Sequence, residues 1–157
     1  MALTKDDIIY KYPLPVYNYK VTVDSKEMAF SEVSGLDITY GEVILYKHGL
    51  SFMEGEFIQS INSTETQKQK PATITLRKGM IRGEDTLYQW IHNHWVNTVL
   101  PMTISLCDEE GNPLIYWDIK RAVPVRLSAP AFNAEANEVA IQSMEVFAKD
   151  IKIIYEK

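Results

Sequence analysis

One residue separates His92 from His94, and two histidines this close in sequence could together bind a metal ion. On a helix, a two-residue separation is a rotation of about 200°, so the two rings would point to different faces. On a strand they would share a face. A helical metal pair needs the spacing i, i+4, and no cysteine or acidic partner follows at ligand spacing. We therefore predict no metal site, with His94 packed in an apolar stripe and His92 solvated.

The other reactive side chains also favour structural roles. Cys107 is the single cysteine, which excludes an internal disulfide, and a lone cysteine is more often a small buried hydrophobe than a nucleophile. The acidic run 108–110 precedes Gly-Asn-Pro and is typical of a solvated turn. The sequence has no glycine-rich phosphate loop. We therefore expect no catalytic site, no cofactor and no enzymatic activity.

Composition excludes further classes of protein. The 157 residues are 46% hydrophobic and 24% charged, which is ordinary for one globular domain. A net charge of −5 argues against a nucleic-acid binder that neutralises phosphates. The first residues lack the apolar segment of a secretory signal, and no apolar run is long enough for a transmembrane helix. We expect synthesis in the bacterial cytoplasm and no stable membrane insertion.

The elements that would position these residues are mostly strands. Alternation of apolar and polar residues predicts strands over 16–23, 36–47, 72–78, 102–108, 114–122 with an edge or bulged strand over 123–128, and 138–155. A helix is predicted over about 84–98, where Leu87, Trp90, Ile91, His94 and Trp95 follow helical spacing. The fold class is therefore mainly β: two packed antiparallel sheets, like a sandwich or barrel, with one flanking helix.

Two segments lie outside this pattern. Residues 1–15 form an N-terminal arm that prolines keep extended, ahead of a single domain over 16–157. Residues 48–70 form a long loop with an apolar first half and a polar second half. Two interpretations stay open for this loop: a mobile surface excursion, or a segment whose apolar half docks on a partner.

A Ser-Gly pair interrupts the strand-like stretch FSEVSGLDITY at residues 30–40. Glycine packs nothing inside a strand and is costly to order there. We predict that Gly35 is a structural turn or bulge that ends one short strand before another begins at Leu36.

Four stretches, taken in order, resemble the tail tube protein family of contractile phage tails and extracellular contractile injection systems. They are YPLPVYNYKVTV (12–23), FSEVSGLDI (30–38), ITLRKG (74–79) with the following helix, and AVPV leading through SAPAFNA to VAIQ (122–142). Together they cover nearly all of residues 12–150. The greatest likeness is to inner tube subunits of the antifeeding-prophage and Photorhabdus virulence cassette type.

This resemblance implies an architecture and a set of partners. It implies six-membered rings whose sheets join into one inner barrel, with rings stacked into a hollow tube that delivers toxin cargo through a target envelope. It also implies a surrounding sheath, baseplate or spike proteins and terminator proteins as partners, in a particle that is released or anchored. No nucleic acid is required.

The arm and the loop supply the predicted contacts between subunits or rings. The candidate interface residues are Tyr10, Tyr12, Leu14, Leu50, Phe52, Met53, Phe57 and Ile58. Two alternatives remain at this point. One is a monomeric β-barrel that binds a small apolar ligand, and the other is a type VI secretion ring protein of the same fold.

Overall fold

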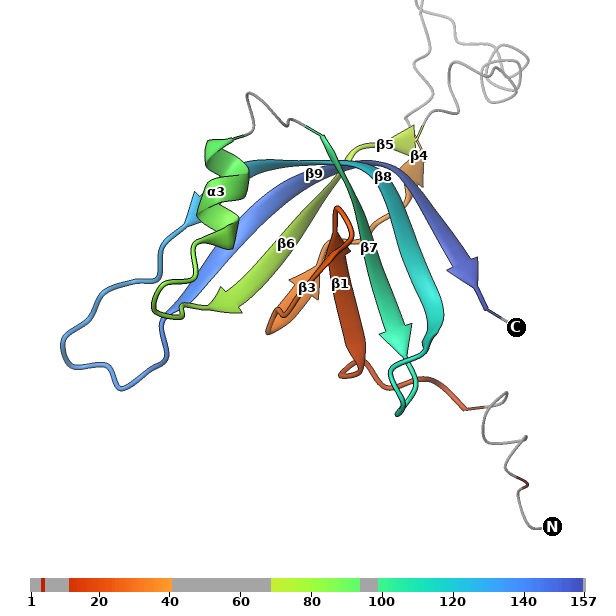
Figure 1. Cartoon of the computed structure of the whole chain (residues 1–157), viewed down its shortest axis with the longest axis horizontal. Helices are drawn as coiled ribbons and strands as arrows, with labels where there is room; N and C mark the ends of the chain where they lie inside the picture. The colour runs from red at the N-terminus through yellow and green to blue at the C-terminus, as the bar shows by residue number, and fades with distance from the viewer. Residues whose placement is uncertain (1–3, 5–11, 41–68, 94–98, 157) are drawn as a thin grey trace, which may run out of the picture.

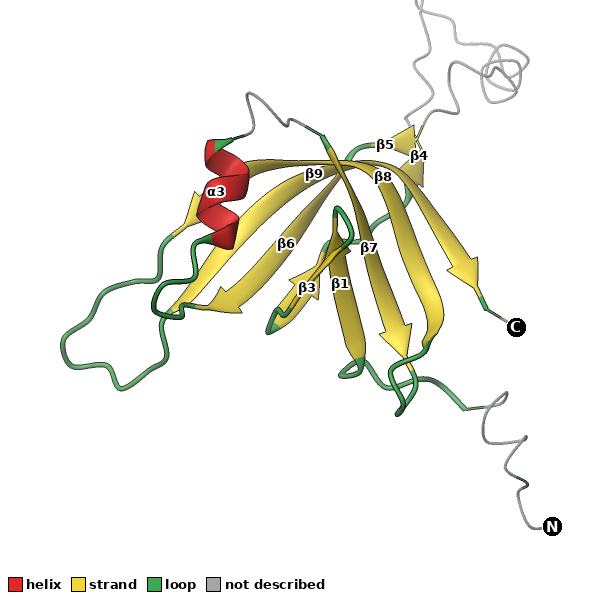
Figure 2. Cartoon of the chain, viewed as in Figure 1, coloured by secondary structure: helices red, strands yellow, loops and turns green. Residues whose placement is uncertain are grey.

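The structure, a computed structural model, describes residues 4, 12–40, 69–93 and 99–156 (Figure 1). Within these ranges it contains nine strands and one helix (Figure 2). In chain order they are β1 (Tyr19–Val23), β2 (Lys26–Met28), β3 (Glu32–Ser34), β4 (Thr39–Tyr40), β5 (Gln69–Lys70), β6 (Ala72–Gly79), α3 (Thr86–His92), β7 (Leu100–Cys107), β8 (Pro113–Ser128) and β9 (Ile141–Tyr155).

Seven of the strands form one antiparallel sheet. Their order is β2-β1-β7-β8-β9-β6-β3, and β4 pairs with β5 in a separate two-stranded ladder. The longest pairing joins β8 to β9, from Ile115 opposite Tyr155 to Ser128 opposite Ser143. The predicted antiparallel, mainly β architecture with one helix is confirmed.

The sheet must roll, because its two edge strands are neighbours in sequence. Six inter-strand spacings would separate the edges of a flat sheet by about 29 Å. Only residues 29–31 join the end of β2 to the start of β3, and the chain from Met28 to Glu32 spans at most about 14 Å. The Tyr19 hydroxyl of β1 donates a hydrogen bond to the Phe30 carbonyl in this link. The two edges therefore face each other, which gives the sheet its barrel-like form.

The two predicted sheets are two halves of this one sheet, and both contain β8 and β9. One half adds β1, β2 and β7, and the other adds β3 and β6. At the corner between the two halves, the side chains of β9 that point into the core change from even-numbered to odd-numbered residues. Met144, Val146 and Ala148 are buried before the corner, and Ile151 is buried after it. Asp150, with φ 60°, causes this change of phase. Side chains from both halves then meet in a single core.

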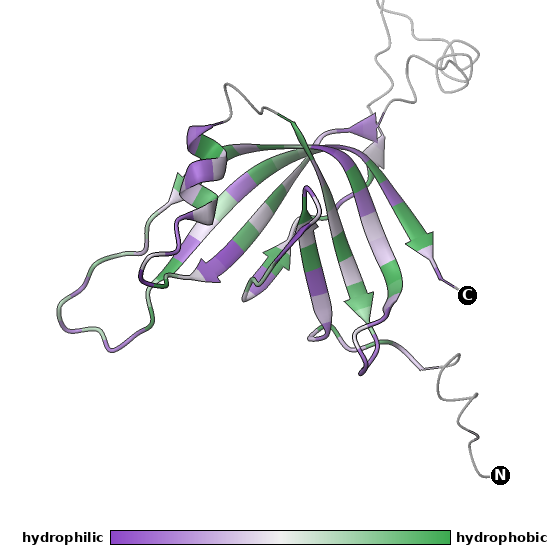
Figure 3. Ribbon diagram, in the orientation of Figure 1, coloured by the Kyte–Doolittle hydropathy of each residue, from purple (hydrophilic) through white to green (hydrophobic). Residues whose placement is uncertain are grey.

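The alternation of apolar and polar residues along the strands correctly predicts which side chains point into the core. Ile74 and Leu76 on β6, both predicted to point inward, are completely buried. Hydropathy alternates visibly along the long strands (Figure 3). Burying side chains of this kind stabilises the fold by about 1.5–3 kcal/mol each. The fully buried side chains of greatest volume are Ile74, Leu76, Leu87, Met102, Ile119, Met144, Val21 and Val146.

The helix is shorter than predicted at its start, and it also ends early, with Asn93 as its C-cap. It begins at Thr86, two residues after the predicted start, and His92 is its last residue. Glu84 lies outside it because this carboxylate forms an ion pair with Lys78 of β6. Leu87 and Trp90 are buried as the apolar stripe predicts. The predicted positions 94–98 lie outside the described residues.

Three strand predictions also need correction. Residues 36–38 are irregular rather than the start of a long strand, and β4 contains only Thr39 and Tyr40; residues 41–47 lie outside the described ranges. The strand predicted from 138 begins at Ile141, because residues 138–140 complete the loop after β8. Segments 114–122 and 123–128 form one strand, β8, with a register shift between Pro124 and Arg126 opposite β9.

Candidate assembly surface

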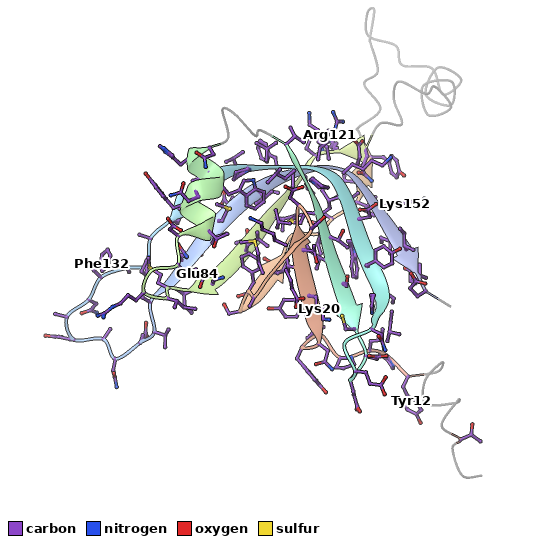
Figure 4. All side chains as sticks on the ribbon, viewed as in Figure 1. Tyr12, Lys20, Glu84, Arg121, Phe132 and Lys152 are labelled. Carbon is purple, nitrogen blue, oxygen red and sulfur yellow. The ribbon has the colours of Figure 1, made fainter. Side chains whose placement is uncertain are left out.

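Two of the eight predicted interface residues lie in the described part of the chain. Tyr12 is 51% exposed, at the lower right of Figure 4, and Leu14 is half-buried. Tyr10 in the arm and the loop residues Leu50, Phe52, Met53, Phe57 and Ile58 lie outside the described residues. Of the predicted interface residues, the described part of the chain therefore places one aromatic ring, Tyr12, at the surface of the arm.

An apolar groove of about 660 Å³ begins where the arm enters β1. Residues from segment 16–19, which leads into β1, and from segment 30–36 around β3 line it, together with Ile104, Leu106 and Trp117. Val16 and Tyr17 line it and are strongly exposed. An open groove with apolar walls on a folded domain is typical of a site that another chain covers.

The loop from 129 to 140 presents the most exposed large apolar side chain of the described residues. Phe132 is 89% exposed and lies at the left of Figure 4, far from Tyr12. The loop has internal order: the Asn133 side-chain oxygen accepts a hydrogen bond from the Glu135 amide at 3.0 Å. The Ala136 amide donates to the Asn133 carbonyl at 3.2 Å. Phe132 is not among the predicted interface residues, although a single aromatic among alanines and a proline was an available signal in the sequence.

Further exposed apolar side chains lie beside α3. Met80 and Ile81, after β6, and Val139, before β9, line one groove of about 640 Å³. Lys78 closes its inner end: the ammonium pairs with Glu84 and sits 5.8 Å from the centre of the Phe30 ring. This ion pair ties the β6–α3 connection to the sheet and leaves the apolar side chains at the rim.

The outer face of the β3-β6-β9-β8 half is mostly polar, with Phe147 of β9 exposed on it beside Thr73. Thr73, Thr75 and Arg77 alternate with the buried residues of β6. Arg77 pairs with Glu32 at 3.1 Å, and Arg126 approaches Glu145 at 3.9 Å. Exposed pairs of this kind contribute about 1 kcal/mol or less each to stability. Their main consequence is a face that can stay in contact with water.

The cysteine and the described histidine, the candidate reactive side chains of the sequence, have structural surroundings. Burial raises the pKa of the Cys107 thiol, which makes this buried cysteine a poor nucleophile. In the described ranges no group of three histidine, cysteine or acidic side chains is placed to hold a metal ion. His92 instead stacks on Tyr88, with ring centroids 5.4 Å apart. His94 lies outside the described residues.

The turn between β7 and β8 is held by one carboxylate. Asp108 accepts hydrogen bonds from the Asn112 amide at 2.8 Å and the Glu110 amide at 2.9 Å. The bond from the Asn112 backbone is the largest influence that lowers the pKa of Asp108. The acidic run is thus a structural turn, as predicted from its composition.

Comparison with known proteins identifies the family. The family model for the T4-like virus tail tube protein gp19 matches residues 15–152. A chain in the structure of an extracellular contractile injection system, the PVC sheath-tube complex in its extended state, is 30% identical. The alignment covers 99% of this chain and 100% of that one, with a TM-score of 0.80. No curated protein sequence matches this chain.

Two further structures extend the comparison. A chain of the anti-feeding prophage tube terminating cap is 31% identical over 99% of this chain and 100% of that one, with a TM-score of 0.75. Hcp1 from Flavobacterium johnsoniae is 13% identical over 89% of this chain and 97% of that one, with a TM-score of 0.56, and shares the fold. No helix in the described ranges has the length and apolar character needed to span a membrane. The chain belongs to the T4-like virus tail tube protein family.

Proposed function

We propose that the protein is an inner-tube subunit of a phage-tail-like contractile injection system, whose copies form hexameric rings that stack into a hollow tube. The observation that carries this proposal is the 30% identity, over the whole of both chains, with a chain of the PVC sheath-tube complex. The polar sheet face suits a water-filled passage for cargo. The exposed apolar side chains at Val16, Phe132 and Met80 suit contacts with neighbouring copies.

Head-to-tail contacts are the kind that such surfaces support. Phe132 and Tyr12 lie at different ends of the molecule in Figure 4, so one patch on a subunit would meet a different patch on the next. Heterologous contacts of this type close into rings when the rotation per subunit closes. Ring closure would also cover sheet edges that otherwise promote aggregation.

The proposed partners follow from the systems in which similar chains occur. Those structures contain a sheath-tube complex, a sheath/tube terminator and a baseplate. We expect this subunit to bind a sheath protein, baseplate and terminator proteins, and toxin cargo in the lumen. We expect the assembled particle to act outside the cell that makes it.

Two alternatives are less well supported. A monomeric barrel that holds an apolar ligand needs an empty interior, whereas the described interior is filled by side chains such as Ile119 and Met144. The likeness to Hcp1 is a likeness of fold alone. A specialised subunit at the end of the tube is a second candidate. The chain of the tube terminating cap is 31% identical to this protein, and the chain of the sheath-tube complex is 30% identical.

Negative-stain electron microscopy of the purified protein, alone and co-expressed with its sheath and baseplate proteins, tests the proposal. We expect rings with six-fold symmetry and stacks of these rings. A protein that remains monomeric under both conditions would refute the proposed function. Subunit counts per native particle separate the two roles, because a tube subunit is present in many rings and an end subunit in one.

A further inference from the structure

The side chain of Gln69 takes the place of a strand beside β9. The pairing of β6 with β9 stops at Ala72 opposite Ala148, while β9 continues to Tyr155. Beyond that point the Ile151 amide donates to the Gln69 side-chain oxygen at 2.8 Å. The Gln69 side-chain nitrogen donates to the Ile151 carbonyl at 3.0 Å. One primary amide therefore satisfies both backbone groups of Ile151, as a neighbouring peptide group would.

The contact between Gln69 and Ile151 lies at the bend of β9. Ile151 follows Asp150, whose left-handed backbone changes the phase of β9. Arg121 on β8 bonds the Asp150 carboxylate through two nitrogens, at 2.9 and 2.8 Å. The Ile151 side chain is 5% exposed and belongs to the core. Unpaired backbone groups at such a buried corner are costly, so the Gln69 amide completes the corner between the two halves of the sheet.

The same contact anchors the β4–β5 ladder. That ladder consists of two residue pairs, Thr39 with Lys70 and Tyr40 with Gln69. A two-stranded ribbon of this size is marginal without other contacts. Pro71 separates β5 from β6 and has no amide proton with which to continue the pairing. Figure 1 shows the ladder standing at the end of the sheet where β8 and β9 bend.

We propose that Gln69 is a positioning residue: its amide acts as the missing strand next to Ile151 and fixes the direction of the β4–β5 ladder, and this direction is required for rings to stack. The ladder stands at one end of the sheet and carries Tyr40, whose side chain is 61% exposed and available to a subunit of the next ring. The second half of the proposal rests on the proposed function. The first half concerns the subunit alone and is independent of assembly.

Three substitutions test the proposal. Gln69→Leu has a similar size and forms neither hydrogen bond, while Gln69→Glu keeps the acceptor for the Ile151 amide and loses the donor. The matched control is Gln89→Leu, which removes an exposed side-chain bond to Asp85 on α3. Amide hydrogen exchange of the isolated subunit is measured first, with Leu76 and Val146 as reporters of the core.

We expect Ile151 exchange to accelerate at least tenfold in Gln69→Leu while the reporter amides stay protected, and to remain at the wild-type rate in Gln89→Leu. In Gln69→Glu we expect the Ile151 exchange rate, relative to wild type measured at the same pH, to fall when the pH drops below about 4. Protonation there restores a donor facing the Ile151 carbonyl. Unchanged Ile151 exchange in Gln69→Leu would overturn the proposal.

Tube length in electron micrographs then tests the consequence for assembly. We expect Gln69→Leu to form single rings or short stacks, and Gln89→Leu to form tubes of wild-type length. Faster Ile151 exchange with normal tubes would refute the stacking role of Gln69 and leave the proposed function standing. Failure of the wild type to form rings would refute the proposed function, and the exchange result would still decide whether Gln69 holds Ile151.

Discussion

At the scale of single residues, Gly35 has the most restrictive surroundings of the four described glycines. Its φ is 90°, and a β-carbon at this position would lie 2.2 Å from the backbone oxygen of Thr73 on β6. The Asp37 amide donates to the Gly35 carbonyl at 2.8 Å, which turns the chain directly after β3. The Ser-Gly interruption in the sequence therefore marks a site where both backbone conformation and space require glycine.

We expect Gly35→Ala to lower the free energy of unfolding by about 2–4 kcal/mol, because left-handed strain and a clash with backbone add together. Gly83→Ala is the matched control. Gly83 has a φ of 83°, but a β-carbon added there would meet no other atom within 4 Å. Urea denaturation of both variants separates the two effects, and equal losses would show that the Thr73 contact is unimportant.

The turn carboxylate Asp108 gives a pH-dependent prediction. Its folded pKa is lowered by hydrogen bonds from backbone amides, the largest from Asn112. The resulting stabilisation is complete above the unfolded pKa, about 4, and is lost as the pH falls through the folded pKa. We expect Asp108→Asn to have a lower urea midpoint than wild type at pH 7, and the gap to shrink at pH 3.

A matched variant controls for charge alone in that experiment. Glu109→Gln removes one negative charge from the same turn. A gap between wild type and Asp108→Asn that stays constant from pH 7 to pH 3, or an equal effect of Glu109→Gln, would contradict the role of the Asp108 hydrogen bonds.

At the scale of elements, α3 illustrates what helical periodicity can predict. The stripe located the helix and its buried residues, since Leu87 and Trp90 pack against the sheet. Periodicity did not locate its start, because Glu84 pairs with Lys78 of β6, which lies outside the helix. Element ends depend on such tertiary partners, and the sequence pattern does not contain them.

We expect Leu87→Ala to cost about 2–5 kcal/mol of stability, since it removes a side chain that is 1% exposed from the core. The neighbouring Tyr88→Ala, on the exposed side of the same helix, serves as control and should cost less than about 1 kcal/mol. Thermal denaturation followed by circular dichroism measures both. Similar losses at the two positions would mean that α3 does not seal the core.

The β8–β9 loop gives a prediction about assembly. Because Phe132 is almost fully exposed, Phe132→Ser should leave the unfolding temperature of the subunit unchanged. Under the proposed function it should reduce the yield of rings or tubes in electron micrographs at least several-fold. Tyr88→Ser, at an exposed aromatic on α3, is the control, and normal assembly of Phe132→Ser would remove this loop from the interface.

At the scale of the whole molecule, strand alternation predicted an antiparallel β protein but not how its sheets connect. The predicted pair of sheets is a single sheet that bends across β8 and β9. The cause lies in local backbone features, namely Asp150 with positive φ and the register shift near Pro124. An aspartate within a strand-like run does not reveal a left-handed backbone. The Gln69 amide contact, 82 residues away from Ile151 in sequence, was equally hidden.

The hairpin of β8 and β9 has a consequence for folding. Its two strands pair along their length and belong to both halves of the sheet. Each half of the sheet continues from this hairpin, and neither half can lose it without exposing the shared core. The domain should therefore melt as one cooperative unit. Circular dichroism and tryptophan fluorescence, with Trp90 on α3 and Trp117 on β8 as probes, should give coincident unfolding curves.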